Sequence, residues 1–198
     1  MVKYSVLDDD ALQDDNLRLA RTLLKRNCCF DMRLFIAIQF DEVVLDALAD
    51  LQEDLRSQGI TGNFTKRENL HITLAFIGEY GNPNTVLDAM ETVNFEPVTI
   101  NFNGVGMFRD LFWIGIEDNP GLVVYVKRLR RELAKEGIPF DRKRFSPHVT
   151  LVRKYRNCND ASLPQIEIPT ETVRRVSLMQ SVRGKHGMVY TEIGGVEL

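Results

Sequence analysis

The sequence feature that most constrains this chain is a four-residue frame that occurs twice, each time beginning with a histidine. The first copy is His71-Ile-Thr-Leu74 and the second is His148-Val-Thr-Leu151. Because the 198-residue chain holds only three histidines, two of them in one frame are hard to attribute to chance. The repeat therefore predicts two structural units of the same kind.

Each frame closes a longer pattern. A short β-rich run predicts a buried strand, an amphipathic stretch predicts a helix, and the frame itself lies in a second strand. In the first unit these segments are residues 33–40, 41–57 and 70–77, and in the second they are residues 111–117, 120–136 and 147–154. With two final strands near residues 172–182 and 189–194, the pattern predicts an α+β fold with an internal pseudo-two-fold repeat.

The chemistry follows from strand geometry. Side chains alternate between the faces of a strand, so His71 and Thr73 point to one face, as do His148 and Thr150. If the units pack about a pseudo-two-fold axis, two imidazoles and two hydroxyls meet in one groove. Histidine acts as acid or base near neutral pH, and threonine can donate hydrogen bonds to phosphate oxygens. Such a site suits in-line hydrolysis of a phosphodiester, without a metal ion or other cofactor.

Other interpretations of the frame are weaker. A single His-x-Thr on a strand is usually structural, but two copies in matched contexts favour function. Zinc binding would need Cys or His-x-x-x-His spacing, which neither frame has, and threonine is a poor ligand. No Gly-x-Ser-x-Gly sequence indicates a serine hydrolase. A non-catalytic module that binds RNA ends or cyclic nucleotides stays open, although arginine or lysine would hold phosphate better than titrating imidazoles.

Composition limits the setting. Three cysteines, two of them adjacent, do not form a disulfide framework. No apolar run is long enough to span a membrane, and no signal peptide is evident, so we expect a cytoplasmic protein with no membrane association. The net charge of −3 argues against coating nucleic acid, yet residues 121–156 carry eleven basic residues against three acidic ones. The basic positions within 127–135 are either a solvated helix face or a phosphate-steering surface.

Beyond the two frames, the sequence resembles the two-histidine (2H) phosphoesterases, and within them the RNA 2′,3′-cyclic phosphodiesterases, formerly called 2′-5′ RNA ligases. The resemblance rests on Met-Arg-Leu-Phe-Ile-Ala-Ile from Met32, on Glu68-Asn-Leu-His-Ile-Thr-Leu-Ala-Phe-Ile-Gly-Glu79, on Phe-Trp-Ile-Gly at 112–115 and on Phe145-Ser-Pro-His-Val-Thr-Leu-Val-Arg153. It implies a bilobal, LigT-like fold in which two antiparallel sheets surround a central groove, with helices outside.

The resemblance also implies an activity and roles for residues. The activity is cleavage of 2′,3′-cyclic phosphate at RNA ends to a 2′-phosphate, with reversible 2′-5′ ligation as an additional reaction. His71 would be the general acid and His148 the general base, while Thr73 and Thr150 bind the phosphate. Arg153, which the family keeps as arginine, is expected to bind the phosphate as well, although strict alternation places it on the opposite face unless a bulge intervenes.

Three further expectations concern the periphery. Relatives often carry tryptophan where this chain has Phe64, which makes Phe64 the candidate for base stacking. Residues 1–31 precede the family-like start at Met32, and their leucine pattern predicts a helical extension to the phosphoesterase domain of residues 32–198. The partner would be RNA or an oligonucleotide with a 2′,3′-cyclic phosphate end, or a small cyclic nucleotide. A monomer is expected, or a dimer formed through residues 1–31, and His186 is expected in a turn.

Overall fold

The computed structural model describes residues 31–94, 96–157, 167–185 and 187–197. The predicted helical extension, apart from Asp31, and the turn residue His186 lie outside these ranges. The described elements are β1 (Met32–Gln39), α2 (Glu42–Ser57), β2 (Ile60–Phe64), η1 (Arg67–Asn69), β3 (His71–Tyr80), α3 (Pro83–Glu91), β4 (Val98–Ile100), β5 (Phe102–Phe108), β6 (Leu111–Ile116), α4 (Pro120–Lys135), β7 (His148–Asn157), β8 (Glu171–Val173), β9 (Arg175–Gly184) and β10 (Gly187–Glu197).

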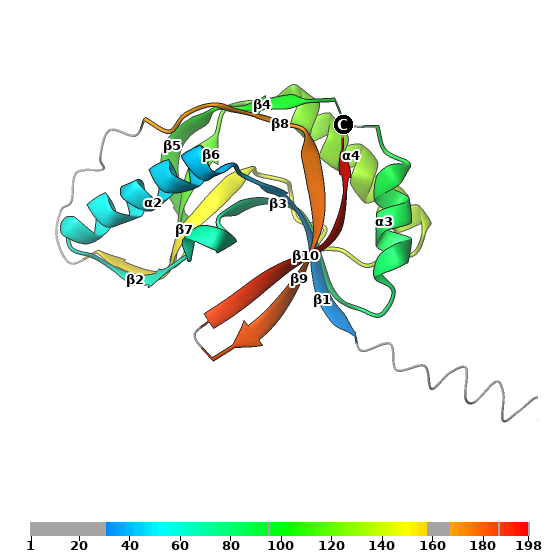
Figure 1. The fold of residues 1–198 in the computed structure, drawn as a ribbon, viewed down its shortest axis with the longest axis horizontal. Coiled ribbons are helices and arrows are strands. Elements are labelled where there is room, and N and C mark those ends of the chain that lie inside the picture. The colour runs from blue at the N-terminus through cyan, green and yellow to red at the C-terminus, as the bar shows by residue number, and fades with distance from the viewer. Residues whose placement is uncertain (1–30, 95, 158–166, 186, 198) are drawn as a thin grey trace, which may run out of the picture. The chain divides into compact units, whose positions relative to one another are not determined.

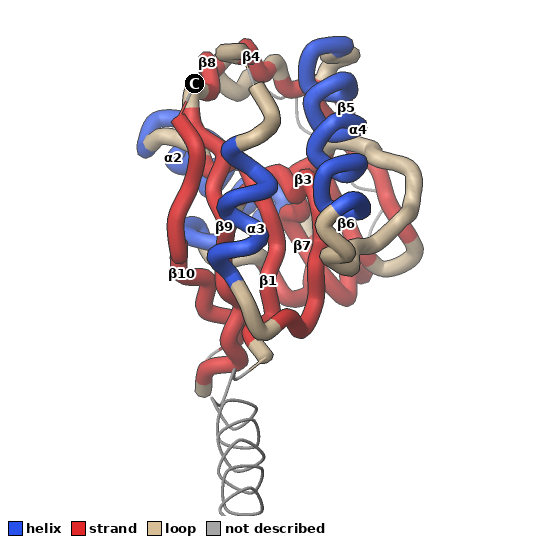
Figure 2. Tube along the Cα trace, turned by 90° about the vertical axis from the view of Figure 1, so that its right-hand side faces the viewer, coloured by secondary structure: helices blue, strands red, loops and turns tan. Residues whose placement is uncertain are grey.

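Eight strands form one antiparallel sheet in the order β10-β9-β1-β3-β7-β6-β5, with β2 paired to β7 (Figures 1 and 2). The two motif strands, β3 and β7, are neighbours at its centre. Their described register contains a single pair, Ile72 opposite Val149. The two sheets expected from the sequence are therefore the two four-stranded halves of one sheet. These halves, β10-β9-β1-β3 and β2-β7-β6-β5, are the two lobes. A separate ribbon of β4 and β8 was not predicted.

The two long helices start and end as the sequence predicts. Asp41 accepts a hydrogen bond from the Val44 amide at the start of α2, and Asn119 accepts one from the Leu122 amide at the start of α4. Gly59 and Gly137 follow the helix ends with φ of 85° and 69°, a conformation that glycine adopts without strain. Each helix has sixteen residues, so the two units match in length as well as in order.

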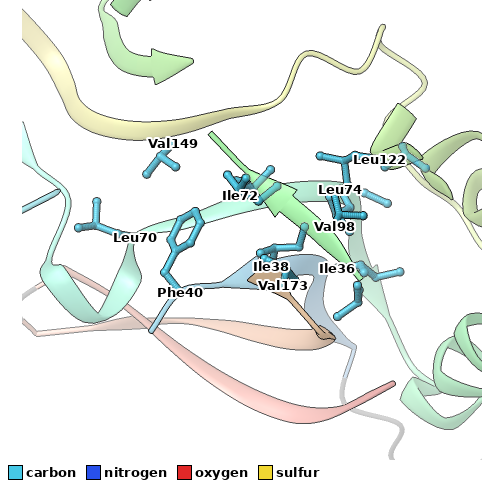
Figure 3. Packing of buried hydrophobic residues seen from close by; sticks show 14 of the residues in the cluster. Ile36, Ile38, Phe40, Leu70, Ile72, Leu74, Val98, Leu122, Val149 and Val173 are labelled. Atoms are coloured by element: carbon cyan, nitrogen blue, oxygen red, sulfur yellow. The ribbon is translucent and has the colours of Figure 1, made fainter. Parts of the chain in front are cut away.

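The helices α2, α3 and α4 share one core with one face of the sheet. Figure 3 shows how Ile36, Ile38, Ile72, Leu74 and Val149 from the central strands meet in this core. Ile72, Leu74 and Val149 are completely buried, and burying such a side chain stabilises the fold by about 1.5–3 kcal/mol. Since the core takes one face of the motif strands, their histidines are placed on the other, which we call the groove face.

Candidate active site

Both motif histidines lie on the groove face, as the alternation of each frame predicts. In β3, the half-buried His71 and Thr73 flank the fully buried Ile72. In β7, the half-buried His148 and Thr150 flank Val149. Because Ile72 and Val149 are opposite each other in the sheet, the two frames lie side by side. The structure thus brings together the four residues that the repeat singles out.

The two imidazoles are held in the same way. His71 Nδ1 lies 2.7 Å from the Asn69 carbonyl oxygen, and His148 Nδ1 lies 2.8 Å from the Ser146 carbonyl oxygen. A carbonyl only accepts, so each Nδ1 carries the proton and donates it. The Nε2 atom of each ring is left for chemistry. His71 Nε2 lies 2.9 Å from Thr73 Oγ1, so in the neutral ring the threonine hydroxyl donates to it.

The environment disfavours a positive charge on both rings. Burial lowers the pKa of His71 to about 4, against the opposing effect of the hydrogen bond to Asn69, and the positive charges of Arg153 and His148 lower it further. Burial also lowers the pKa of His148, again opposed by a backbone hydrogen bond and assisted by Arg153. In the free protein at pH 7, both imidazoles are therefore predominantly neutral.

Arg153 reaches the groove face through a β-bulge. Thr150 is opposite Trp113 and Val152 is opposite Phe112, so Leu151 has no partner in the register with β6. This extra residue reverses the alternation, which places Leu151 and Val152 both in the core and Arg153 on the same face as Thr150. The charge of Arg153 acts on both histidines, as its effect on their pKa values indicates.

The first motif strand has a bulge at the equivalent place. Thr73 is opposite Ala37 and Ala75 is opposite Ile36, so Leu74 is the extra residue. Beyond this bulge, Phe76 takes the position that Arg153 has in β7. The guanidinium of Arg33 lies over the Phe76 ring, 4.9 Å from its centroid. In each motif strand, the fifth residue after the histidine thus lies on the groove face.

Aromatic rings flank each histidine. The rings of Phe35 and Tyr190 lie 5.0 and 5.4 Å from that of His71. In the other lobe, Phe108 lies edge-on to His148 at 5.3 Å and stacks on Trp113 at 5.0 Å. These contacts give each imidazole an apolar surround and explain the dominance of burial in its pKa.

Comparison with known proteins assigns the family. A family model described as the 2′-5′ RNA ligase superfamily matches residues 44–185, well over half of the chain. This chain belongs to the 2′-5′ RNA ligase superfamily. The match contains both histidine frames and the aromatic residues on the His148 side, Phe108 and Trp113. It confirms the resemblance seen in the sequence.

Two relatives align with this sequence over most of their length. The chain is 30% identical to the RNA 2′,3′-cyclic phosphodiesterase of Thermotoga maritima over 176 residues, which are 80% of this chain and 91% of that protein. It is 29% identical to the enzyme of the same name from Methanothermobacter thermautotrophicus over 180 residues, which are 82% and 96% of the two chains.

Solved structures of the superfamily share the fold. Escherichia coli LigT in its apo form has a TM-score of 0.74 at 22% identity, over 85% of this chain and 98% of that one. TT0787 of Thermus thermophilus has a TM-score of 0.71 at 26% identity, over 84% and 98%. The predicted α+β, LigT-like fold is thereby confirmed.

Phe64 does not lie where the superfamily resemblance placed it. It is opposite Val152, whose side chain is in the core, and Phe64 itself packs against that core. The Arg56 guanidinium of α2 lies 4.0 Å from the Phe64 ring centroid. The ring is thus on the face opposite His148 and already stacked, which corrects the expectation that it stacks on a base. Its neighbour Asn63, opposite Arg153, is the β2 residue on the groove face.

Sequence reasoning missed the aromatic residues beside the histidines. Phe108 is 45% exposed at the end of β5, next to the β5–β6 turn. Trp113 lies against Gly106, where an added Cβ would collide with the indole ring. The sequence did contain a signal for this contact. A glycine-rich strand, Gly-Val-Gly at 104–106, lies close in sequence to Trp-Ile-Gly at 113–115, and glycine in a strand often marks the close approach of a large neighbour.

Two further observations concern the described residues. Among them, no three His, Cys, Asp or Glu side chains lie close enough together to hold a metal ion. Likewise, none of the described helices is long and apolar enough to cross a membrane.

Proposed function

We propose that this protein is an RNA 2′,3′-cyclic phosphodiesterase, which hydrolyses a terminal 2′,3′-cyclic phosphate to a 2′-phosphate. The observation that carries the proposal is the matched presentation of two imidazoles. Each is fixed at Nδ1 by a backbone carbonyl two residues earlier, and its Nε2 is left for chemistry on the groove face. The names of the relatives from Thermotoga maritima and Methanothermobacter thermautotrophicus agree with this activity.

In the proposed reaction, His148 Nε2 takes a proton from water as the water oxygen attacks phosphorus. The bond from phosphorus to the 3′ oxygen breaks on the opposite side, and His71 Nε2 gives its proton to that oxygen. Thr73 and Thr150 donate hydrogen bonds to the non-bridging oxygens, and Arg153 stabilises their negative charge. The product keeps phosphate on the 2′ oxygen, and each histidine ends in the opposite protonation state.

Under this assignment, His71 must carry a proton on Nε2 before the reaction. Its pKa of about 4 in the free protein leaves it without the proton that an acid must give. A bound cyclic phosphate is an anion, and an anion beside an imidazole raises its pKa because it favours the charged form. We therefore propose that substrate binding protonates His71. Thr73, which donates to the neutral ring, can then turn its hydroxyl proton toward a phosphate oxygen.

We assign base stacking to Phe108 instead of Phe64. The Phe108 ring is partly exposed and adjoins His148, so a base attached to the reacting ribose can lie on it without rearrangement of the strands. Stacking on an aromatic side chain tolerates any base and contributes about 1–3 kcal/mol. Its support by Trp113 on the other side keeps the ring in place.

Two related activities use the same site. If a 5′-hydroxyl of RNA replaces water as the nucleophile, the identical steps join two RNA ends through a 2′-5′ linkage. A module that binds cyclic phosphate ends without turnover is the alternative. The intact histidine and threonine of both frames favour the enzyme, because a binding module gains nothing from two neutral imidazoles.

The setting is also proposed. RNA or an oligonucleotide with a 2′,3′-cyclic phosphate end, or a small cyclic nucleotide, is the partner, because each presents the same reacting group. We propose a monomer working in the cytoplasm without a cofactor. The site is built from one chain, and the odd number of cysteines does not favour an oxidising compartment.

The deciding experiment measures turnover of 2′,3′-cyclic AMP and of an oligoribonucleotide with a cyclic phosphate end. The variants His71→Ala and His148→Ala should each lose at least about 10²-fold in kcat, as expected for a positioned acid or base. The matched control is His186→Ala, which removes the histidine outside both frames and should keep full activity. Phosphorus NMR of the product should show a 2′-phosphate. A wild-type protein that binds the substrate but never opens the ring would establish the binding module instead.

A further inference from the structure

Gln52 and Arg130 occupy the same place in the two repeated units. Gln52 is the eleventh residue of α2 and Arg130 is the eleventh residue of α4. The Gln52 side chain is only 3% exposed, which is unusual for a polar residue in the middle of a helix. Arg130 belongs to the basic region around the second frame, but its guanidinium is partly buried and donates to backbone carbonyls.

The two side chains bind equivalent carbonyl groups. Gln52 Nε2 donates to the carbonyl oxygen of Leu151 at 2.8 Å, and Arg130 Nη2 donates to that of Leu74 at 3.1 Å. Leu74 and Leu151 are the bulge residues, each three positions after a motif histidine. A bulge disrupts the ladder, and a buried carbonyl needs a donor. The two helices thus supply a side-chain donor at the corresponding defect of each motif strand.

The contacts are crossed between the units. Gln52 comes from the first unit and binds the bulge of the second motif strand, whereas Arg130 comes from the second unit and binds the bulge of the first. Each side chain also binds the segment that leads into the motif histidine of its own unit. Gln52 Nε2 donates to the Thr65 carbonyl at 2.9 Å, and Arg130 Nη1 donates to the Lys143 carbonyl at 2.7 Å.

These bonds lie where the sheet gives little support. In the described register, Ile72 and Val149 are the one residue pair that joins the two motif strands. Two backbone bonds assist nearby, from the Thr65 amide to the Leu151 carbonyl and from the Asp141 amide to the Phe76 carbonyl, both at 2.8 Å. The relative placement of the two motif strands at the site therefore depends on a small number of contacts. Gln52 and Arg130 each add two hydrogen bonds, which join the segment before one motif histidine to the bulge after the other.

We propose that Gln52 and Arg130 are positioning residues that together set the separation of the His71 and His148 imidazoles. This inference rests on the proposed function, because only a two-histidine reaction requires both rings at a fixed distance from one phosphorus. The crossed pattern means that loss of either side chain frees the segment before one motif histidine from the bulge after the other, so the positions of both histidines are affected. A misplacement of about 1 Å can cost about 10²-fold in rate.

The test uses Gln52→Met and Arg130→Met, which keep much of the side-chain volume and remove the donors. Arg128→Met is the matched control, because it removes the same charge from the exposed face of the same helix. We expect kcat on 2′,3′-cyclic AMP to fall about 10- to 100-fold in each test variant, with KM changed less than kcat. Arg130→Lys, which keeps a cationic donor, should recover part of the loss. The control should match the wild type.

Three measurements separate positioning from general destabilisation. Activity is measured well below the melting temperature of each variant, so that the folded fraction is complete. The pH profile of kcat/KM should shift in the test variants, because the histidines then influence each other differently. The double variant should lose less than the product of the single losses, since both side chains set one distance. Folded variants with wild-type kcat and an unchanged pH profile would overturn the proposal.

The proposal and the proposed function fail in different ways. If the wild type and Arg128→Met do not turn over a cyclic nucleotide, the proposed function is wrong. The positioning role is then read by NMR of the imidazole resonances with inorganic phosphate as the probe. Under the proposal, Gln52→Met and Arg130→Met change the titration of both His71 and His148. Unchanged titration of both rings would reject it independently of any activity.

Discussion

A protein that keeps a histidine neutral inside its fold loses stability when the solution becomes acidic. His71 has a pKa of about 4 in the folded chain, mainly because burial disfavours its charged form. In the unfolded chain it returns to the ordinary value of about 6.5. Above pH 6.5 both states are neutral and the group has no pH-dependent effect. As the pH falls from 6.5 to 4, the unfolded state takes up a proton that the folded state does not, so unfolding becomes more favourable.

The size of the effect follows from the two pKa values. Relative to pH 8, the free energy of unfolding should fall by about 2 kcal/mol at pH 5 and about 3 kcal/mol at pH 4 through this one residue. His148, whose pKa is also lowered, adds in the same direction. In His71→Gln, which cannot take up the proton, the contribution of residue 71 disappears, while carboxylates such as Asp141 contribute equally to both chains.

Urea unfolding of the wild type and of His71→Gln, followed at pH 8, 6, 5 and 4, measures this difference. The wild-type midpoint should decrease between pH 8 and pH 5 by about 1 M more than that of the variant. Addition of inorganic phosphate at pH 5 should reduce the difference, because an anion in the site raises the pKa of His71. Equal pH dependence in the two chains would refute the reasoning, since it would mean that His71 titrates normally in the fold.

Three other predictions concern the site and its surroundings. The rate should fall on both sides of a pH optimum, and the lowered pKa values of the two histidines should move the optimum of kcat/KM to the acid side of that for two ordinary imidazoles. EDTA should have no effect on the rate. Activity that chelation abolishes and zinc restores would indicate a metal site. Phe108→Ala should weaken binding of an RNA end about 5- to 100-fold while the neighbouring Met107→Ala does not, as measured by KM and by fluorescence titration. A chain beginning at Met32 should keep its rate on a small cyclic nucleotide, but it should melt at a lower temperature or change in size by light scattering. The reason is that the leucines of residues 1–31 need a surface to bury against. An identical melting temperature and size would show that this segment contributes neither to stability nor to assembly.

The parts of the fold that the sequence predicts are those with a local signal. The two histidine frames predict which side chains share a face, since a regular strand alternates strictly. The helices of the two units follow from amphipathic spacing, with Asp41 and Gly59 marking the ends of the first. The joining of the two lobes into a single sheet through Ile72 and Val149 has no local signal, because it depends on how the two units pack.

The bulge in β7 accounts for the positions of both Arg153 and Phe64. Strict alternation places Arg153 on the core face unless a bulge intervenes, and a β-bulge has no reliable mark in the sequence. The assignment of Phe64 to base stacking came from the family resemblance. An inserted residue at Leu151 reverses the faces of the residues beyond it, which brings Arg153 to the groove face and leaves Phe64 opposite the buried Val152. The Leu151 carbonyl at this bulge accepts from the Gln52 side chain as well as from the Thr65 amide. The bulges therefore give a reason for two residues that the helix pattern does not explain, a buried glutamine in α2 and an arginine at the same position of α4. Their shared role becomes visible only when the two units are compared position by position.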